Sequence, residues 1–303
     1  MELPFRATTF TFGFEEYLNL NEENSYRYAE FYNEDFQDGL YMSSKLYVTW
    51  KIPTGLLVSR YGELTYTPGI AARFNHEFPD WPLLPFRKGP FLDFSHSLGF
   101  ERIDWHANFR DGLSASIGNS YTYDFFRLNN DDEPLSVSLT LHGAGYFIIN
   151  RFFGISSRLQ YRHWFYHDPD YYVQAGDNLR GIADRAISAD YMLSLNMDFP
   201  LRALLFTPSK WFNNKKLNFF DVELHVSPVI DLALYHDPEL EISFNPKNIA
   251  ASGGIELIIF SDFMRNLYIR FGYTMDLRDL AATKNLFESG NNREIYLIMG
   301  HFY

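Results

Sequence analysis

The residues of this chain that could do chemistry do not form a recognisable catalytic motif. A metal site is one possibility, because one segment holds two histidines and three aspartates, namely His163, His167, Asp168, Asp170 and Asp177. Their spacing matches no common ligand pattern, such as His-Glu-x-x-His on a helix. We therefore interpret the segment as a solvated acidic loop, and we expect no metal ion and no cofactor.

A hydrolytic site is a second possibility, because Ser114, Asp124 and His142 share a face on neighbouring predicted strands. Such a coincidence is expected wherever the polar faces of strands are rich in these residue types. The chain has no Gly-x-Ser-x-Gly turn, no P-loop and no dinucleotide-binding glycine cluster. We therefore expect that the protein is not an enzyme.

The composition narrows the class of protein. The chain has 303 residues, no Cys and a formal net charge of −12. The lack of Cys excludes disulfides, thiol catalysis, iron–sulfur clusters and Cys-ligated zinc. The acidic balance argues against a nucleic-acid partner. The 30 Phe, 21 Tyr and 5 Trp sit in a chain of mean hydropathy −0.24, which indicates that apolar and polar residues are interleaved.

Strict alternation of apolar and polar residues is the dominant pattern. In 187–199 and in 220–235, apolar residues occupy nearly every second position and polar residues lie between them. A period of two places the two sets on opposite faces of a strand. Strands of soluble proteins are usually about 5–6 residues long, whereas alternating segments of at least about 9–11 residues are typical of a transmembrane β-barrel.

The pattern predicts an all-β fold, a closed antiparallel transmembrane β-barrel of about 12 strands, with 14 or 16 also possible. We expect one domain over 1–303, without a POTRA domain, in the bacterial outer membrane. Connectors alternate between long polar loops and short turns, except for a long turn at 202–217. The predicted strands lie near 5–18, 39–52, 55–74, 89–104, 112–126, 135–149, 152–166, 186–201, 218–235, 250–261, 267–277 and 293–303.

The last predicted strand places Ile295, Leu297, Met299 and the terminal Tyr303 on one face. A final strand that ends in an aromatic residue resembles the recognition signal of barrels delivered to the outer-membrane assembly machinery. We expect these four residues to form such an assembly signal.

Four motifs in the C-terminal half resemble those of the outer-membrane assembly factor, or bacterial surface antigen, superfamily, which includes barrel insertases and two-partner secretion transporters. The resemblance covers roughly 150–303, and the order and spacing of the motifs resemble those of the family. The motifs are Leu-Arg-Gly-Ile at 179–182, Leu-Asn-Met-Asp-Phe-Pro-Leu at 195–201, Val-Ile-Asp-Leu-Ala at 229–233 and Gly-Gly-Ile-Glu-Leu at 253–257.

The resemblance implies that loop 167–185 folds back into the barrel lumen. A buried Arg needs a carboxylate partner, so Arg180 would pair with the lumen-facing Asp231, with Asp198 or Asn196 adjacent. Gly181 would allow a tight turn against the wall. The alternative is a solvated Arg180 at the tip of a polar loop.

The resemblance favours a role in outer-membrane protein assembly or translocation, in which a seam between the first and last strands opens to a client strand. The chain could be an accessory subunit, with outer-membrane lipid and other subunits of an assembly or secretion complex as partners. Two alternatives remain at this point, a passive pore or transporter and a structural surface barrel.

Overall fold

A computed structural model describes most of the chain. The described residues are 8–20, 40–58, 62–77, 89–106, 108–125, 134–165, 173–174, 178–182, 188–236, 249–261, 267–284 and 293–301. Most of them lie in antiparallel strands, which confirms the predicted all-β fold.

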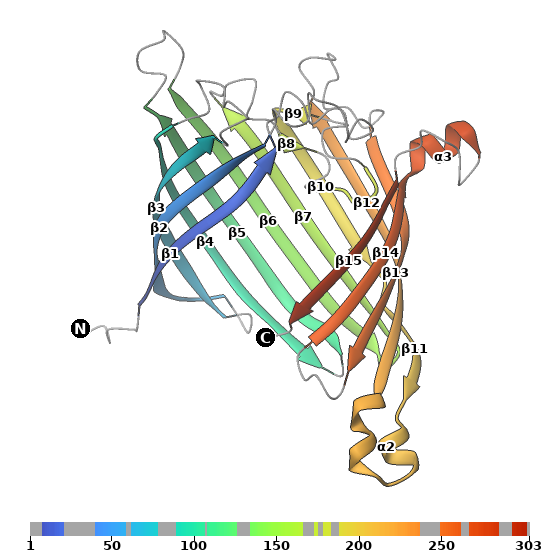
Figure 1. The fold of residues 1–303 in the computed structure, drawn as a ribbon. Helices are drawn as coiled ribbons and strands as arrows, with labels where there is room; N and C mark the ends of the chain where they lie inside the picture. Colours follow the sequence, from blue (N-terminus) through green and yellow to red (C-terminus); the bar gives the residue numbers. More distant parts are fainter. Residues whose placement is uncertain are drawn as a thin grey trace. The chain divides into compact units, whose positions relative to one another are not determined.

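Thirteen of the strands form one sheet, in which the strands follow one another in chain order from β1 to β15. β11 lies off this path and pairs with β12 and β7, and a separate two-stranded sheet joins β8 to β9. β1 and β15 are the two ends of the order (Figure 1). The strands are β1 (Thr9–Leu20), β2 (Leu40–Leu57), β3 (Glu63–Glu77), β4 (Phe91–His106), β5 (Phe109–Asp124), β6 (Leu135–Asn150), β7 (Phe153–Phe165), β8 (Val173–Gln174), β9 (Ser188–Ala189), β10 (Tyr191–Asp198), β11 (Leu201–Phe206), β12 (Val222–His236), β13 (Ile249–Ser261), β14 (Leu267–Asp276) and β15 (Arg293–His301).

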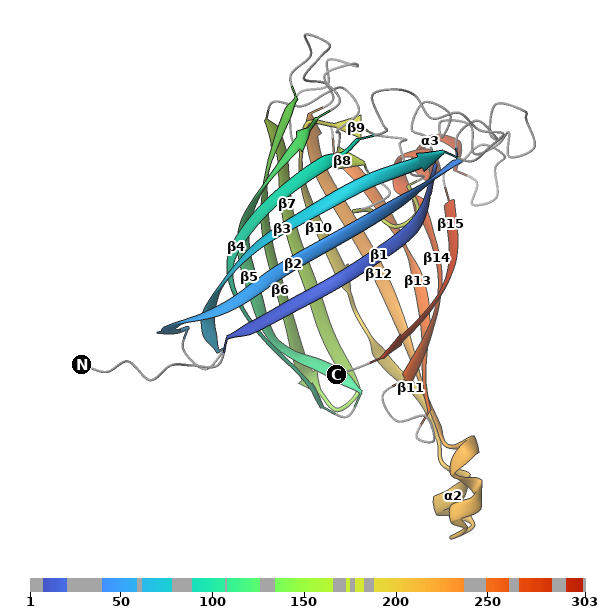
Figure 2. The ribbon, with the colours of Figure 1, turned by 60° about the vertical axis from the view of Figure 1, so that its left-hand side comes forward.

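The chain divides into two compact units, of which the first comprises Met1–Glu101, Ala115–Leu141 and Tyr161–Val173. Its strands β1, β2 and β3 lie side by side (Figure 2). One face of β1 is apolar, and its side chains Phe10, Phe12 and Phe14 are all exposed. The ring of Phe10 stacks on Trp50 of β2 at 5.0 Å between centroids.

The second unit comprises Arg102–Ser114, His142–Gln160 and Gln174–Tyr303. Its central strand, β12, pairs with β10 and β11 along one edge and with β13 along the other. The polar side of β12, including His225, Ser227 and Asp231, is buried, whereas Ile230 on its apolar side is 38% exposed. This arrangement is the reverse of a soluble sheet, and it confirms the faces predicted from alternation.

The segment 202–217 corrects one prediction, because it is not a simple turn. It continues as strand β11, followed by the short helix α2 (Pro208–Trp211) and the 3-10 helix η5 (Lys215–Phe220). Both helices lie beyond the ends of β11 and β12 (Figures 1 and 2). Sequence periodicity missed β11 because a bulge between Arg202 and Leu204 breaks its alternation.

Several further boundaries differ from the prediction. The strand predicted at 218–235 begins only at Val222, because residues 215–220 form η5. β2 continues to Leu57, so the third strand begins at Glu63 rather than at 55. The strand predicted at 186–201 is divided into β9 and β10. The connector predicted between the strands at 267–277 and 293–303 begins with helix α3 (Leu277–Thr283), which the side chain of Asp276 caps. In the part of the chain that the structure describes, no helix combines the length and the apolar character that a membrane span requires.

Most of the residues assigned to the long loops lie outside the described residues. The prediction of a single domain over 1–303 therefore stays a prediction.

Candidate functional site

The residues 178–182 form a short segment that packs against the polar face of the second unit. Two apolar residues hold it there, because Leu179 is 1% and Ile182 is 2% exposed. The Asn196 side chain on β10 donates a hydrogen bond of 2.7 Å to the backbone oxygen of Asn178. Arg180 therefore lies on a well-packed piece of chain and not at a solvated loop tip.

Arg180 donates three hydrogen bonds to Asp231 of β12. Its Nε donates to Oδ2 at 2.9 Å and its Nη2 donates to Oδ1 at 2.6 Å, so the guanidinium group and the carboxylate form a two-pronged pair. The backbone N–H of Arg180 also donates to Oδ2, at 2.8 Å. Asp231 thus fixes both the side chain and the backbone of the segment.

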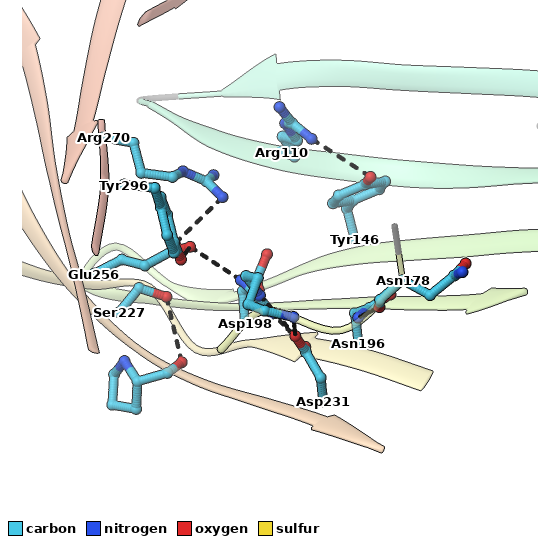
Figure 3. A network of polar contacts seen from close by, with 12 residues as sticks. Arg110, Tyr146, Asn178, Asn196, Asp198, Ser227, Asp231, Glu256, Arg270 and Tyr296 are labelled. Carbon is cyan, nitrogen blue, oxygen red and sulfur yellow. Dashed lines mark hydrogen bonds and ion pairs between the residues drawn. The ribbon is translucent and has the colours of Figure 1, made fainter. Parts of the chain in front are cut away.

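The remaining nitrogen of the Arg180 guanidinium group contacts two more carboxylates. Its Nη1 lies 2.7 Å from Asp198 Oδ1 and 3.0 Å from Glu256 Oε1. Glu256 is fully buried, and its second oxygen lies 3.2 Å from Nη1 of Arg270. The hydroxyl of Tyr296 donates to the first oxygen (Figure 3). We call these six residues the Arg180 cluster: Arg180, Asp198, Asp231, Glu256, Arg270 and Tyr296.

Arg180 neutralises much of the negative charge in the cluster. Three carboxylates face two arginines, and Arg180 contacts all three carboxylates. Burial opposes the charge on the guanidinium group, but the hydrogen bonds to Asp231 and the charges of the carboxylates outweigh it and raise the pKa of Arg180. Arg180 therefore stays charged in this environment.

Gly181 brings the segment against β14 and β15. Its backbone N–H donates to Glu294 Oε2 at 2.9 Å. Its φ is +79°, and a Cβ at this position would lie 2.5 Å from the backbone nitrogen of Met275. The left-handed φ and the close approach to the backbone both require glycine.

Replacing Gly181 with alanine is therefore expected to destabilise the docked segment by about 1–3 kcal/mol. Denaturant unfolding of the refolded protein measures the change. Gly143→Ala is the matched control, because a Cβ at Gly143 meets no atom within 4 Å and its φ is not left-handed. Equal losses for the two variants would contradict the close packing of Gly181.

The structure brings together all five residues that the sequence named for this site: Arg180, Gly181, Asp231, Asp198 and Asn196. The sequence reasoning gave no role to Glu256, Arg270, Tyr296 and Glu294. Alternation along β13 identifies Glu256, since Ile255 and Leu257 on either side of it are exposed. Arg270 and Glu294 lie on strands with an alternating pattern, but only the register between strands shows what they contact.

The residues of the predicted C-terminal signal are placed in part. Ile295 and Leu297 on β15 are each 67% exposed, on the same side of the strand. Met299 lies opposite Ile269 of β14, and Tyr303 lies outside the described residues. Their role as an assembly signal stays a prediction.

The segment weighed as a metal site is described only at His163. Its ring lies 3.9 Å from the ring of Phe165 and accepts or donates a hydrogen bond of 3.2 Å with the Tyr161 hydroxyl. The other four residues, His167, Asp168, Asp170 and Asp177, lie outside the described residues.

The Arg180 cluster holds segment 178–182 in place against the sheet. Its ion pairs join segment 178–182 to strands β10, β12 and β13, and the hydrogen bond from Gly181 to Glu294 adds strand β15. The antiparallel strand order and the buried polar face define the class of the fold, an all-β sheet of the β-barrel type.

The comparisons with known proteins agree with this class. The fold is similar to that in "The crystal structure of BamA from Haemophilus ducreyi lacking POTRA domains 1-3", with a TM-score of 0.57 and 15% sequence identity. The similarity covers 97% of this chain and 59% of that chain, so this chain spans about three fifths of that BamA chain's length. No protein-family model and no curated protein matches the sequence.

The resemblance that four short motifs indicated is thus confirmed at the level of the fold. It also extends further than the sequence suggested, because the motifs were confined to roughly 150–303, whereas the structural similarity covers nearly the whole chain.

Proposed function

We propose that this protein is a bacterial outer-membrane β-barrel that takes part in the assembly or translocation of other outer-membrane proteins. The observation that supports this most is the Arg180 cluster, which fastens a loop segment to the polar face of a sheet whose fold resembles the barrel of BamA. In this proposal the polar face lines the lumen, and residues 178–182 form a latch inside it.

The exposed apolar face of the strands would meet the outer-membrane lipid. Phe12 of β1 and Ile255 of β13 are large apolar residues that are about half to three quarters exposed. An apolar band facing outward and a polar interior are the arrangement of transmembrane barrels. Other subunits of an assembly or secretion complex would be the protein partners, with this chain as an accessory subunit.

The end strands β1 and β15 would form the seam at which a client strand is received. Each is an end of the strand order, and in the described residues each pairs with one neighbour only, β2 or β14. Backbone groups at the edge of such a strand can pair with an incoming strand. A seam of this kind would distinguish an assembly factor from a passive pore.

A seam lock tests the proposal. The chain has no Cys, so a panel of double variants can join one position in 9–14 to one in 293–298 by a disulfide. We expect vesicles that contain the protein to speed the folding of a urea-denatured outer-membrane barrel, measured by heat-modifiable gel migration. A formed seam disulfide is expected to abolish the acceleration, and reductant to restore it.

The matched control is a disulfide between Thr11 and Thr49, which lie opposite each other in the ladder of β1 and β2. Opposed residues in an antiparallel pair are close enough to be bridged. This disulfide is expected to leave the acceleration intact. Ion conductance without any acceleration of client folding would overturn the proposal in favour of a pore.

A further inference from the structure

The turn between β11 and β12 carries an unusual combination of side chains. We call residues 207–221 the basic aromatic extension. Its three lysines, Lys210, Lys215 and Lys216, are exposed, whereas its one acidic residue is buried. This positive surface belongs to a chain with a net charge of −12. Four aromatic side chains are also more than half exposed: Trp211, Phe212, Phe219 and Phe220.

Hydrogen bonds within the extension fix its backbone, so its aromatic side chains are exposed on a folded structure. The acidic residue, Asp221, is 2% exposed and accepts hydrogen bonds from the backbone N–H of Ser209, at 3.0 Å, and from the Ser209 hydroxyl. This contact joins the start of α2 to the end of η5. Asn214 caps η5 by accepting from the backbone N–H of Lys216.

The base of the extension is also fixed. Arg202 of β11 donates from Nε to Glu223 Oε1 of β12 at 2.6 Å, and Nε2 of the buried His225 lies 2.6 Å from the same oxygen. The two strands that carry the extension are therefore clamped together by a polar contact.

The apolar surface of the extension continues the exposed face of the strand that precedes it. Leu204, Leu205 and Phe206 of β11 are all exposed, and the ring of Phe206 packs edge-to-face on Trp211 at 5.0 Å. The extension therefore starts where the exposed apolar strand face ends. α3 lies at the opposite end of β12 and β13 (Figures 1 and 2).

We propose that the basic aromatic extension binds the headgroup region of a phospholipid bilayer that contains anionic lipid, at the rim where β11 and β12 leave the membrane. This inference rests on the proposed function, because it requires that the strands span a bilayer. Aromatic rings settle at the boundary between acyl chains and headgroups, and lysines between them are attracted to lipid phosphates.

The continuity with β11 favours a lipid surface over a protein. Under the proposed function, the residues next to the extension already face lipid. The same bilayer can therefore cover the aromatic side chains of the extension, and no additional protein is needed to remove them from water. Each lysine near an anionic membrane surface adds about 1 kcal/mol of attraction, or about a fivefold gain in binding. An acidic protein surface is the other occupant of suitable charge, and it is one outcome of the test.

A single fluorescent label tests the inference on the full chain. Phe212→Cys creates a unique thiol for an environment-sensitive nitrobenzoxadiazole probe, since the chain has no Cys. Ala282→Cys on exposed α3 is the control site. In vesicles of phosphatidylcholine with phosphatidylglycerol, we expect blue-shifted emission and quenching by brominated lipid at 212 but not at 282. Replacing Lys210, Lys215 and Lys216 by Gln is expected to remove the dependence on phosphatidylglycerol.

The outcomes separate the inference from the proposed function. If the protein migrates as an inserted, heat-modifiable barrel but the probe at 212 stays water-like in every vesicle, the inference is overturned and the proposed function stands. Shielding of the probe only in native membranes that contain other proteins would overturn it in favour of a protein partner. A chain that fails to insert would contradict both.

Discussion

Replacing Arg180 with alanine is expected to lower the free energy of unfolding by about 3–5 kcal/mol, the usual cost of removing one partner from a buried ion pair. The loss is large because Arg180 forms an ion pair with each of the three carboxylates, whereas the ion pair of Arg270 is with Glu256. Asp231→Ala is expected to cost less, since Arg180 keeps its contacts with Asp198 and Glu256. Denaturant unfolding of the refolded protein in detergent measures both losses.

The double variant, Arg180→Ala with Asp231→Ala, is expected to lose less than the sum of the single losses, with a coupling of about 0.5–3 kcal/mol. Arg102→Ala serves as the control, because Arg102 and Asp104 form an exposed ion pair of 3.3 Å. Exposed pairs contribute at most about 1 kcal/mol. Strictly additive losses would show that Arg180 and Asp231 do not act as a pair.

Placing a charge on the apolar face of β1 is expected to have the second large effect. Phe12 is 76% exposed, so Phe12→Arg creates no steric conflict and would be tolerated in water. In a bilayer, an arginine on the lipid side costs from about 1 kcal/mol near the interface to about 4 kcal/mol at the midplane. The yield of folded protein in liposomes is therefore expected to fall.

Thr11→Arg is the matched control, because Thr11 precedes Phe12, is also exposed and points to the opposite face of the strand. We expect its folding yield in liposomes to stay close to that of the unmodified chain. Equal yields for the two variants would mean that the exposed phenylalanines of β1 do not face lipid.

The strands could be predicted from the sequence because each has one polar and one apolar face, so the period of two is visible without any knowledge of pairing. The region around β11 could not be predicted in this way. The consecutive residues Leu204 and Leu205 are both exposed, and the alternation of apolar and polar residues is lost there because a bulge shifts the register. α2 and η5 are too short to show a helical period.

Arg180 and Asp231 could be predicted because both lie in motifs that resemble those of a known family, and alternation also gave the strand face of Asp231. The outer members of the candidate site depend on the register between strands, which the sequence does not reveal. Thr274 pairs with Glu294 across β14 and β15, and this pairing places Glu294 beside Gly181. No local pattern around Gly181 indicates that the β14 backbone approaches it so closely.

The contacts of segment 178–182 also constrain the order in which the chain can fold. Arg180 reaches partners 51 and 76 residues further along the chain, and Gly181 reaches one 113 residues further. Contacts of such long separation form late, because the loops that they close cost conformational entropy first. The complete set of contacts requires β15, which follows β14 in the chain, so a docked segment is a sign that β15 has already joined the sheet.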